Sequence, residues 1–328
     1  MKKIDVVRAI LKNRMPIKPK LKSAQAFAPT NIALCKYWGK RNSELNLPVT
    51  SSLSISLGNK GAKMKFTVSD QFAITLNGKI VELSSGFATR LLQFLQLFQI
   101  QQHFNIRIET NIPIAAGLAS SACGFAACVQ ALNKLFAWKL TDTELSILAR
   151  LGSGSASRSC WQGFVEWYAG KQEDGMDSYA EPIEMTWPEL RIGILLFSEA
   201  QKNISSREAM QRTVETSALY ATWPQKVAAD LIAVKRAIIS RNFNLLGKTA
   251  ESNAIAMHET MLHAWPPVNY FLPSTKMAMQ HIWDLRAQGL PLYFTQDAGP
   301  NLKLLFLEKD STIIQQNFPT IEIIQPFL

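Results

Sequence analysis

One short segment carries side chains and backbone suited to binding phosphate. The run Pro113-Ile-Ala-Ala-Gly-Leu-Ala-Ser-Ser-Ala122 precedes an Ala- and Leu-rich stretch that predicts a helix. Free N–H groups and the positive end of the dipole at a helix start bind phosphate oxygens. We therefore predict a phosphate cradle made by Gly117, Leu118, Ala119, Ser120 and Ser121. Small residues before a helix also serve close packing, and that alternative stays open at this point.

Two further segments each place one charged side chain beside small residues. The loop Gly152-Ser-Gly-Ser-Ala-Ser-Arg158 ends on an arginine, whose planar fork matches a carboxylate bidentately. The run Tyr293-Phe-Thr-Gln-Asp-Ala-Gly-Pro-Asn301 places Asp297 at the end of a strand-like stretch. A carboxylate in this place can accept a proton from a substrate hydroxyl. An ordinary turn would explain the same Asp, and a turn anchor would explain the same Arg.

A fourth segment, Ala28-Pro-Thr-Asn-Ile-Ala-Leu-Cys-Lys-Tyr-Trp-Gly-Lys40, ends an apolar run with two lysines and two aromatic residues. Lys40 and Tyr37 are candidates for binding an anionic ligand. The alternative interpretation, core aromatic rings and a solvated lysine, is strongest for Trp38.

Together these four segments resemble the GHMP family of small-molecule kinases and, within it, the mevalonate diphosphate decarboxylases. The matching strings occur in the same order as in that family and run from about Ala26 to the C-terminus. They are Lys-Tyr-Trp-Gly-Lys, Gly-Leu-Ala-Ser-Ser-Ala, Gly-Ser-Gly-Ser-Ala-Ser-Arg and Asp-Ala-Gly-Pro-Asn. The resemblance implies an α+β, two-lobed GHMP kinase fold with the active site in the cleft between the lobes.

The resemblance also implies a reaction. The enzyme would catalyse ATP-dependent decarboxylation of 5-diphosphomevalonate to isopentenyl diphosphate, CO2, ADP and phosphate, through transient 3-phosphorylation. The cofactors implied are ATP, as co-substrate, and Mg²⁺. One alternative is a related GHMP enzyme acting on mevalonate phosphate, either a phosphomevalonate decarboxylase or a mevalonate 3-kinase. A catalytically inactive relative that only binds ligands is another.

Individual residues receive roles from the same resemblance. Asp297 would face the tertiary hydroxyl, and Arg158 would bind the substrate carboxylate with help from Ser153 and Ser155. Lys40, also assigned a catalytic role, would hold the diphosphate end. The other residues assigned to the diphosphate are Tyr37, Ser206 and Arg207.

The cradle would hold the phosphates of ATP, with Ser121 as a ligand of Mg²⁺. Mg²⁺ keeps several waters and binds phosphate oxygens, so few protein ligands are expected. Lys36, Asn31 and Ser52 lie in matching strings without an assigned role, and His258 is interpreted as a core histidine.

The net charge of +10 is concentrated at the N-terminus. Residues 1–25 hold eight Lys or Arg and one Asp, which leaves +3 for the remaining 303 residues. Because a nucleic-acid protein normally carries its basic patch on the folded body, nucleic acid is not an expected partner. Ile4, Val7, Ile10 and Leu11 recur at helical spacing, which predicts a docked amphipathic extension, with a targeting or membrane-surface role as the alternative.

Other compositional features indicate a globular protein of a reducing compartment. The sequence is 47% hydrophobic and 18% charged, and no apolar run reaches the ~18 residues of a membrane helix. The four cysteines and four histidines show no metal-ligand spacing, so we expect free thiols and a cytoplasmic location. The expected partner is the small-molecule substrate. The oligomeric state stays open, with a homodimer as one alternative.

The elements that must position these segments follow from periodicity and turn signals. The chain from 25 to 109 is mainly β, with Asn77-Gly78 as a hairpin turn, and helices are expected at 86–100, 122–136 and 141–150. Beyond Trp187-Pro-Glu189 the pattern changes to long helices between short strands. We therefore predict a basic extension at 1–25, an ATP-binding domain at 26–188 and a second GHMP domain at 189–328.

Overall fold

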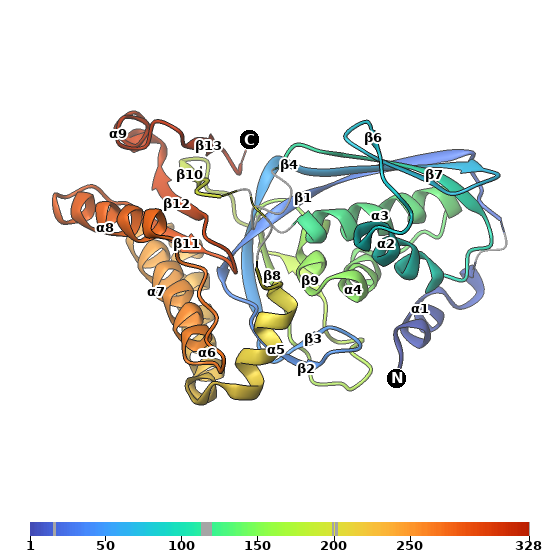
Figure 1. The fold of residues 1–328 in the computed structure, drawn as a ribbon, viewed down its shortest axis with the longest axis horizontal. Coiled ribbons are helices and arrows are strands. Elements are labelled where there is room, and N and C mark those ends of the chain that lie inside the picture. Colours follow the sequence, from blue (N-terminus) through green and yellow to red (C-terminus); the bar gives the residue numbers. More distant parts are fainter. Residues whose placement is uncertain (16–17, 113–119, 199, 201–202, 328) are drawn as a thin grey trace.

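The structure is a computed structural model that describes residues 1–15, 18–112, 120–198, 200 and 203–327. A seven-stranded mixed sheet organises the first half of the chain (Figure 1). Its order is β6-β5-β7-β4-β8-β9, with β1 paired to β4; β5 and β7 are parallel and the other pairs antiparallel. The strands are β1 (Ser23–Cys35), β4 (Ser52–Ser69), β5 (Ala73–Leu76), β6 (Lys79–Ile80), β7 (His103–Thr110), β8 (Phe164–Trp167) and β9 (Ala180–Pro182).

Helices rich in Ala and Leu cover this sheet. Helix α3 (Ser120–Phe136) packs on β1 and β4, and its apolar residues enter the main hydrophobic core. Helix α4 (Asp142–Gly152) begins at a capping box, in which Thr141 and Glu144 satisfy each other's backbone N–H groups. Helix α2 (Gly86–Gln96) contributes Leu91, Phe94 and Leu95 to the same core.

A small hairpin and a short helical turn complete the first lobe near the site. Strands β2 (Lys40–Asn42) and β3 (Leu47–Pro48) pair as a two-stranded sheet that carries Lys40. The 3-10 helix η2 (Gly154–Cys160) follows α4 and carries Arg158. It packs against α3, α4 and β1, so the arginine loop is held by the core.

The second lobe combines a four-stranded antiparallel sheet with long helices. The order of the sheet is β11-β12-β10-β13. Helix α7 packs on β11, on α6 and on β1 of the first lobe. The elements are β10 (Leu190–Leu195), α5 (Ser206–Thr216), η3 (Ala218–Thr222), α6 (Trp223–Ile239), α7 (Phe243–Leu262), α8 (Pro273–Ala287), β11 (Tyr293–Gln296), β12 (Leu302–Leu307), η4 (Glu308–Asp310), α9 (Ser311–Asn317) and β13 (Glu322–Ile324).

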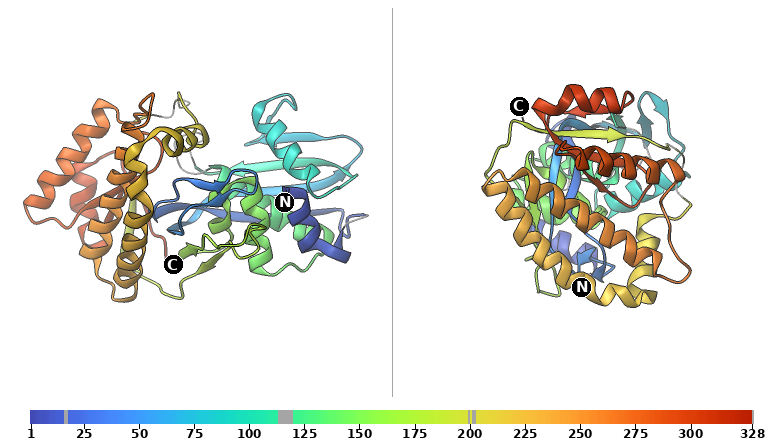
Figure 2. Two further views of the ribbon diagram at one scale, coloured as in Figure 1. Left: turned by 90° about the horizontal axis from the view of Figure 1, so that it is seen from below. Right: turned by 90° about the vertical axis from the view of Figure 1, so that its left-hand side faces the viewer.

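The two groups of elements lie side by side as two lobes. The left view in Figure 2 shows the helices of the second lobe stacked against one end of the first, where β1 and β4 reach them. The mixed two-lobed architecture matches the expected fold class. No helix in the described part of the chain is long and apolar enough to cross a membrane.

The basic N-terminus folds onto the first lobe. Helix α1 (Lys3–Leu11) buries Val6, Val7, Ile10 and Leu11, and the 3-10 helix η1 (Lys12–Arg14) follows it. The predicted amphipathic helix is therefore present and docked, with Val6 as a buried residue that the periodicity did not include. Arg14 ends this segment in an ion pair with Glu144 at 2.5 Å.

Most predicted elements are present, and the differences concern their limits. The Asn77-Gly78 turn joins β5 to β6 as expected, with positive φ at both residues. The helix predicted over 86–100 ends at Gln96. Within the region 25–109, expected to be mainly β, residues Ser52–Ser69 form the single long strand β4, which pairs with β1 along most of its length.

Candidate active site

Asp297 lies where the two lobes meet, and both of its carboxylate oxygens are bound by buried lysines. Lys36 Nζ, from the end of β1, is 2.7 Å from Oδ1, and Lys303 Nζ, from β12, is 3.2 Å from Oδ2. The two lysine side chains are 2% and 1% exposed, whereas that of Asp297 is 25% exposed. Asp297 is therefore fixed from behind, with part of its carboxylate facing outward.

The two lysines also determine the ionisation of Asp297. Burial alone would raise the pKa of Asp297, but the positive charges of Lys36 and Lys303 outweigh it and hold the pKa below its usual range. Burial lowers the pKa of Lys36, and the carboxylate of Asp297 opposes that shift. We therefore treat Asp297 as ionised throughout the neutral range.

A hydrogen-bond network from the second lobe positions Lys36. The backbone N–H of Lys36 donates to Asn253 Oδ1 at 2.8 Å, and Asn253 Nδ2 donates to Asp230 Oδ2 at 2.7 Å. Asp230 is bound in turn by Lys226 at 2.6 Å. Cys35 lies in the same network: it accepts a hydrogen bond from Asn253 at 3.8 Å and donates to the carbonyl of Val227 at 3.7 Å. The end of β1 is thus attached to α6 and α7.

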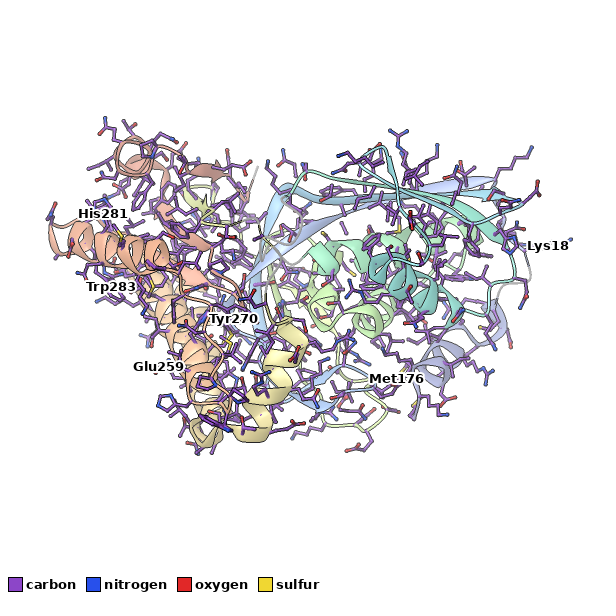
Figure 3. All side chains as sticks on the ribbon, viewed as in Figure 1. Lys18, Met176, Glu259, Tyr270, His281 and Trp283 are labelled. Atoms are coloured by element: carbon purple, nitrogen blue, oxygen red, sulfur yellow. The ribbon has the colours of Figure 1, made fainter. Side chains whose placement is uncertain are left out.

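His258 supports the same carboxylate through the backbone. Its Nε2 lies 3.2 Å from the carbonyl oxygen of Asp297, so Nε2 carries the proton and donates it. Burial and the nearby charge of Lys36 lower the pKa of His258 to about 3, which keeps the ring neutral. Tyr270, labelled in Figure 3 where the lobes meet, packs edge-on against this ring. These contacts agree with the interpretation of His258 as a core histidine.

Arg158 is buried, with the acceptors of its guanidinium on the first lobe. Its Nε and Nη2 each lie 3.3 Å from Asn31 Oδ1, and Nη1 donates to Ser52 Oγ. The guanidinium carbon also lies 5.8 Å from the ring centroid of Trp167. Burial lowers the pKa of Arg158 to about 10, and the charge of Asp297 acts against this shift. Arg158 therefore remains a cation within electrostatic range of Asp297.

Three serine hydroxyls from two predicted segments lie next to one another. Ser121 Oγ, in the first turn of α3, is 3.3 Å from Ser153 Oγ, which is 3.3 Å from Ser155 Oγ. Asn31 holds this loop by donating to the carbonyl of Ser155 at 3.2 Å. The start of α3 and the arginine loop therefore form one polar surface.

The proposed Mg²⁺ and phosphate ligands can be tested against this surface. Ser121 offers an oxygen donor at a helix start, which is the chemistry that Mg²⁺ and phosphate require. Among the residues that the structure describes, no group of three or more His, Cys, Asp or Glu forms a protein-only metal site. The residues present thus suit a Mg²⁺ ion bound mainly through phosphate oxygens. Gly117, Leu118 and Ala119 lie outside the described residues, as does the side chain of Ser120.

A second group of cations surrounds Lys40. Lys40 Nζ donates to Asn46 Oδ1 at 2.7 Å, and in the described part of the chain it has no carboxylate partner. Burial and the charges of Arg207 and Lys3 lower the pKa of Lys40 to about 8. Arg207, on α5 of the second lobe, is exposed, and the adjacent Ser206 is half-buried. Lys40 and Arg207, two predicted diphosphate ligands from different lobes, are therefore within electrostatic range of each other.

The two aromatic residues beside Lys40 differ in their surroundings. The hydroxyl of Tyr37 is buried and finds no hydrogen-bond partner among the described residues, while its ring packs edge-on against Trp167 at 4.8 Å. Trp38 is buried, and its carbonyl accepts hydrogen bonds from Tyr220 and Trp223 at 3.0 Å each. The core interpretation thus holds for Trp38, whose indole N–H, like the Tyr37 hydroxyl, is buried and finds no partner among the described residues.

Several functional contacts were not predicted from the sequence. Lys36, Asn31 and Ser52, which had no assigned role, bind Asp297 or Arg158. Lys303 was not a candidate, although a single lysine inside the apolar strand Leu302–Leu307 is a signal of a buried ion pair. Asn253 and Asp230 give no comparable signal, because polar residues on helices are ordinary.

Comparisons with known proteins cover both halves of the chain. The chain matches the model of the diphosphomevalonate decarboxylase-like N-terminal domain over residues 28–180. It matches the model of the mevalonate 5-diphosphate decarboxylase C-terminal domain over residues 192–324. A diphosphomevalonate decarboxylase of Aspergillus fumigatus is 39% identical over 316 residues, which cover 89% of this chain and 78% of that protein.

Solved structures agree with the sequence matches. The mevalonate diphosphate decarboxylase of Staphylococcus aureus superposes with a TM-score of 0.87 at 35% identity, covering 93% of this chain and 95% of that one. The protein MDDEF, solved in complex with MVAPP, AMPPCP and magnesium, gives a TM-score of 0.85 at 38% identity, covering 92% and 95%. The similarity thus extends over both lobes.

Proposed function

The chain belongs to the diphosphomevalonate decarboxylase family, and from this membership we propose that it catalyses the ATP-dependent decarboxylation of 5-diphosphomevalonate. The products are isopentenyl diphosphate, CO2, ADP and phosphate. The fold is the GHMP kinase fold. The observation that carries the proposal is the ionised Asp297 between two buried lysines, within electrostatic range of the buried Arg158.

Asp297 is proposed to orient the 3-hydroxyl of the substrate for attack on the γ-phosphate of ATP. Its pKa lies below the usual range, so it is a weak base and a strong hydrogen-bond acceptor. Phosphoryl transfer passes through a loose transition state, in which positioning and electrostatic stabilisation contribute more than early proton removal. An acceptor fixed by Lys36 and Lys303 suits this task.

Arg158 is proposed to bind the carboxylate that leaves as CO2. After phosphorylation, the C–O bond at the tertiary carbon breaks and its electron pair leaves with phosphate. The C–C bond to the carboxylate then breaks, and its electron pair forms the new double bond. Ser153 and Ser155 lie in the same loop and can donate hydrogen bonds to substrate oxygens. Asn31 and Ser52 fix the guanidinium so that its orientation is set before the substrate binds.

The remaining charged groups are proposed to bind phosphates. Lys40, Tyr37, Ser206 and Arg207 would hold the diphosphate end of the substrate. The start of α3 would hold the phosphates of ATP, with Ser121 contributing to the Mg²⁺ site. When bound, Mg²⁺ neutralises charge on the phosphate oxygens.

Stoichiometry provides the direct test. The full chain is incubated with ATP, Mg²⁺ and 5-diphosphomevalonate labelled at the carboxylate carbon, while CO2 and ADP are measured together. We expect release of CO2 to require ATP and to equal ADP formation. ADP without CO2 would identify a kinase that stops at the phosphate ester. Mevalonate 5-phosphate is tested in parallel. A kcat/KM that is higher for mevalonate 5-phosphate than for 5-diphosphomevalonate would identify a decarboxylase of the monophosphate.

The same proposal includes a domain boundary and a cellular location. We place the domain boundary near residue 188, between the two sheets, and treat residues 1–25 as an extension of the first lobe. A cytoplasmic location is supported by the four free cysteines. The oligomeric state is a separate matter: light scattering of the purified protein distinguishes a monomer from a homodimer.

A further inference from the structure

Helix α1 is a built part of the first lobe, although it precedes both regions that the family models match. Val6, Val7 and Leu11 are 0% exposed, and Ile10 is 2% exposed. Arg14 secures the end of the segment through Glu144 and the carbonyl of Trp138. Because the helix is fixed in this way, its first residues occupy a defined position on the first lobe.

That place is the β2–β3 hairpin, which carries part of the proposed diphosphate site. The backbone N–H of Lys3 donates to Glu44 Oε1 at 3.3 Å, and Glu44 lies in the turn between the two strands. The same hairpin holds Lys40, whose Nζ is bound by Asn46 Oδ1 at 2.7 Å. In Figure 1 the first turn of α1 faces this hairpin, with α5 on its other side.

Three cations from three elements therefore face one region: Lys3 of α1, Lys40 of β2 and Arg207 of α5. Their like charges act on one another, since Arg207 lowers the pKa of both lysines and Lys3 lowers that of Lys40. The carboxylate of Glu44 raises the pKa of Lys3, whereas the charges that act on Lys40 are those of Arg207 and Lys3. The cluster is thus positively charged overall and suited to a multiply charged anion.

We propose that Lys3 is a specificity-determining residue, which brings a third cation to the diphosphate end of the substrate and favours a diphosphate over a monophosphate. This inference rests on the proposed function for the position of the diphosphate. A second phosphoryl group adds negative charge that Lys40 and Arg207 alone neutralise less completely. The basic N-terminus thus contributes to substrate binding in addition to packing on the first lobe.

The experiment compares Lys3→Gln with Lys12→Gln in the full chain. Both variants remove one lysine charge from the same N-terminal segment, but Lys12 is exposed at the end of the helix away from the hairpin. For Lys3→Gln we expect KM for 5-diphosphomevalonate, and the inhibition constant of inorganic pyrophosphate, to rise about three- to tenfold. We expect kcat and KM for ATP to stay within about twofold, and Lys12→Gln to match the wild type.

Further arms separate the possible outcomes. Binding of mevalonate 5-phosphate should weaken less than binding of the diphosphate, because the monophosphate lacks the outer phosphoryl group. Equal values for Lys3→Gln and Lys12→Gln would overturn the proposal, and so would an equal rise in KM for ATP. Calorimetric titration of both variants with 5-diphosphomevalonate tests Lys3 even if the wild type releases no CO2, so failure of the proposed function is distinguishable.

Discussion

At the scale of single residues, the site depends on a carboxylate whose charge is maintained by its neighbours. Lys36 and Lys303 each bind one oxygen of Asp297, so the acceptor is held in one orientation. A neutral amide of the same shape would leave both buried lysines without a counter-charge and would turn an N–H group toward one of them. The stability of a variant at Asp297 therefore has to be measured together with its activity.

For Asp297→Asn we expect kcat to fall by about 10²–10⁴-fold, while KM for the substrate changes little. The loss arises because the neutral amide lacks the charge with which the carboxylate orients the substrate hydroxyl and strengthens the hydrogen bond to it. Steady-state kinetics measure both constants. Asp284→Asn, an exposed change on α8, serves as the control. If Asp297→Asn turned over near the wild-type rate, Asp297 would be a turn residue with no role in the reaction.

The lowered pKa of Lys40, about 8, predicts a pH dependence of substrate capture. As pH rises through this value the free enzyme loses the ammonium charge, so kcat/KM for 5-diphosphomevalonate should fall above pH 8. The bound diphosphate raises the pKa of Lys40, so kcat should decline only at higher pH. In Lys40→Arg the charge persists at every pH tested, and the decline of kcat/KM should disappear. A decline that is unchanged in this variant would point to another group.

At the scale of elements, the end of β1 is positioned by helices of the other lobe. Asn253 of α7 accepts from the backbone of Lys36 and donates to Asp230 of α6. Because Lys36 also binds Asp297, one amide side chain links two helices to the reacting group. A displacement of the Lys36 backbone would therefore also displace the side chain that binds the Asp297 carboxylate.

We expect Asn253→Ala to lower the free energy of unfolding by about 1–3 kcal/mol, because it leaves buried groups unpaired. It should also lower kcat by at least about tenfold, because Lys36 loses its support. Urea unfolding and steady-state kinetics measure the two effects. Asn244→Ala removes a bond to Tyr293 from the same helix and should leave kcat unchanged. A loss of stability with kcat intact would make Asn253 structural only.

The elements also show how far the sequence predicts the fold. Helix α3 and strand β12 follow their sequence patterns closely, because burial and periodicity agree there. Strand β4 does not, since Gly58-Asn-Lys-Gly61 has the composition of a turn. The ladder to β1 stops at Ser56 and resumes at Gly61, and the register shift between Pro29 and Asn31 leaves residues 57–60 without partners in β1. Pairing on both sides of the segment thus keeps β4 one strand despite the local turn signal.

At the scale of the whole molecule, the site consists of pairs that are distant in sequence. Lys36 and Asp297 are 261 residues apart, and no periodicity relates them. Resemblance to a family indicated Asp297 and Arg158. The contacts of Lys36 with Asp297 and with Asn253 depend on how the lobes dock, so Asn253 became visible only in three dimensions. Asn31 and Ser52 hold Arg158 within the first lobe, and Lys303 holds Asp297 within the second. Ser121 and Ser153, by contrast, were predicted separately and lie together.

The docking of the lobes has a further consequence for thiol chemistry. Cys35 is 0% exposed beneath α6 and α7, and burial raises the pKa of its thiol to about 12. A thiol-specific reagent can therefore reach it only when β1 separates from those helices. In a variant that retains Cys35 as its single cysteine, we expect substrate and an ATP analogue to slow labelling by Ellman's reagent. A labelling rate that is the same with and without both ligands would assign the opening to local motion of the helices. If the ligands slow labelling, the reactivity of this one sulfur atom reports how often the two lobes separate.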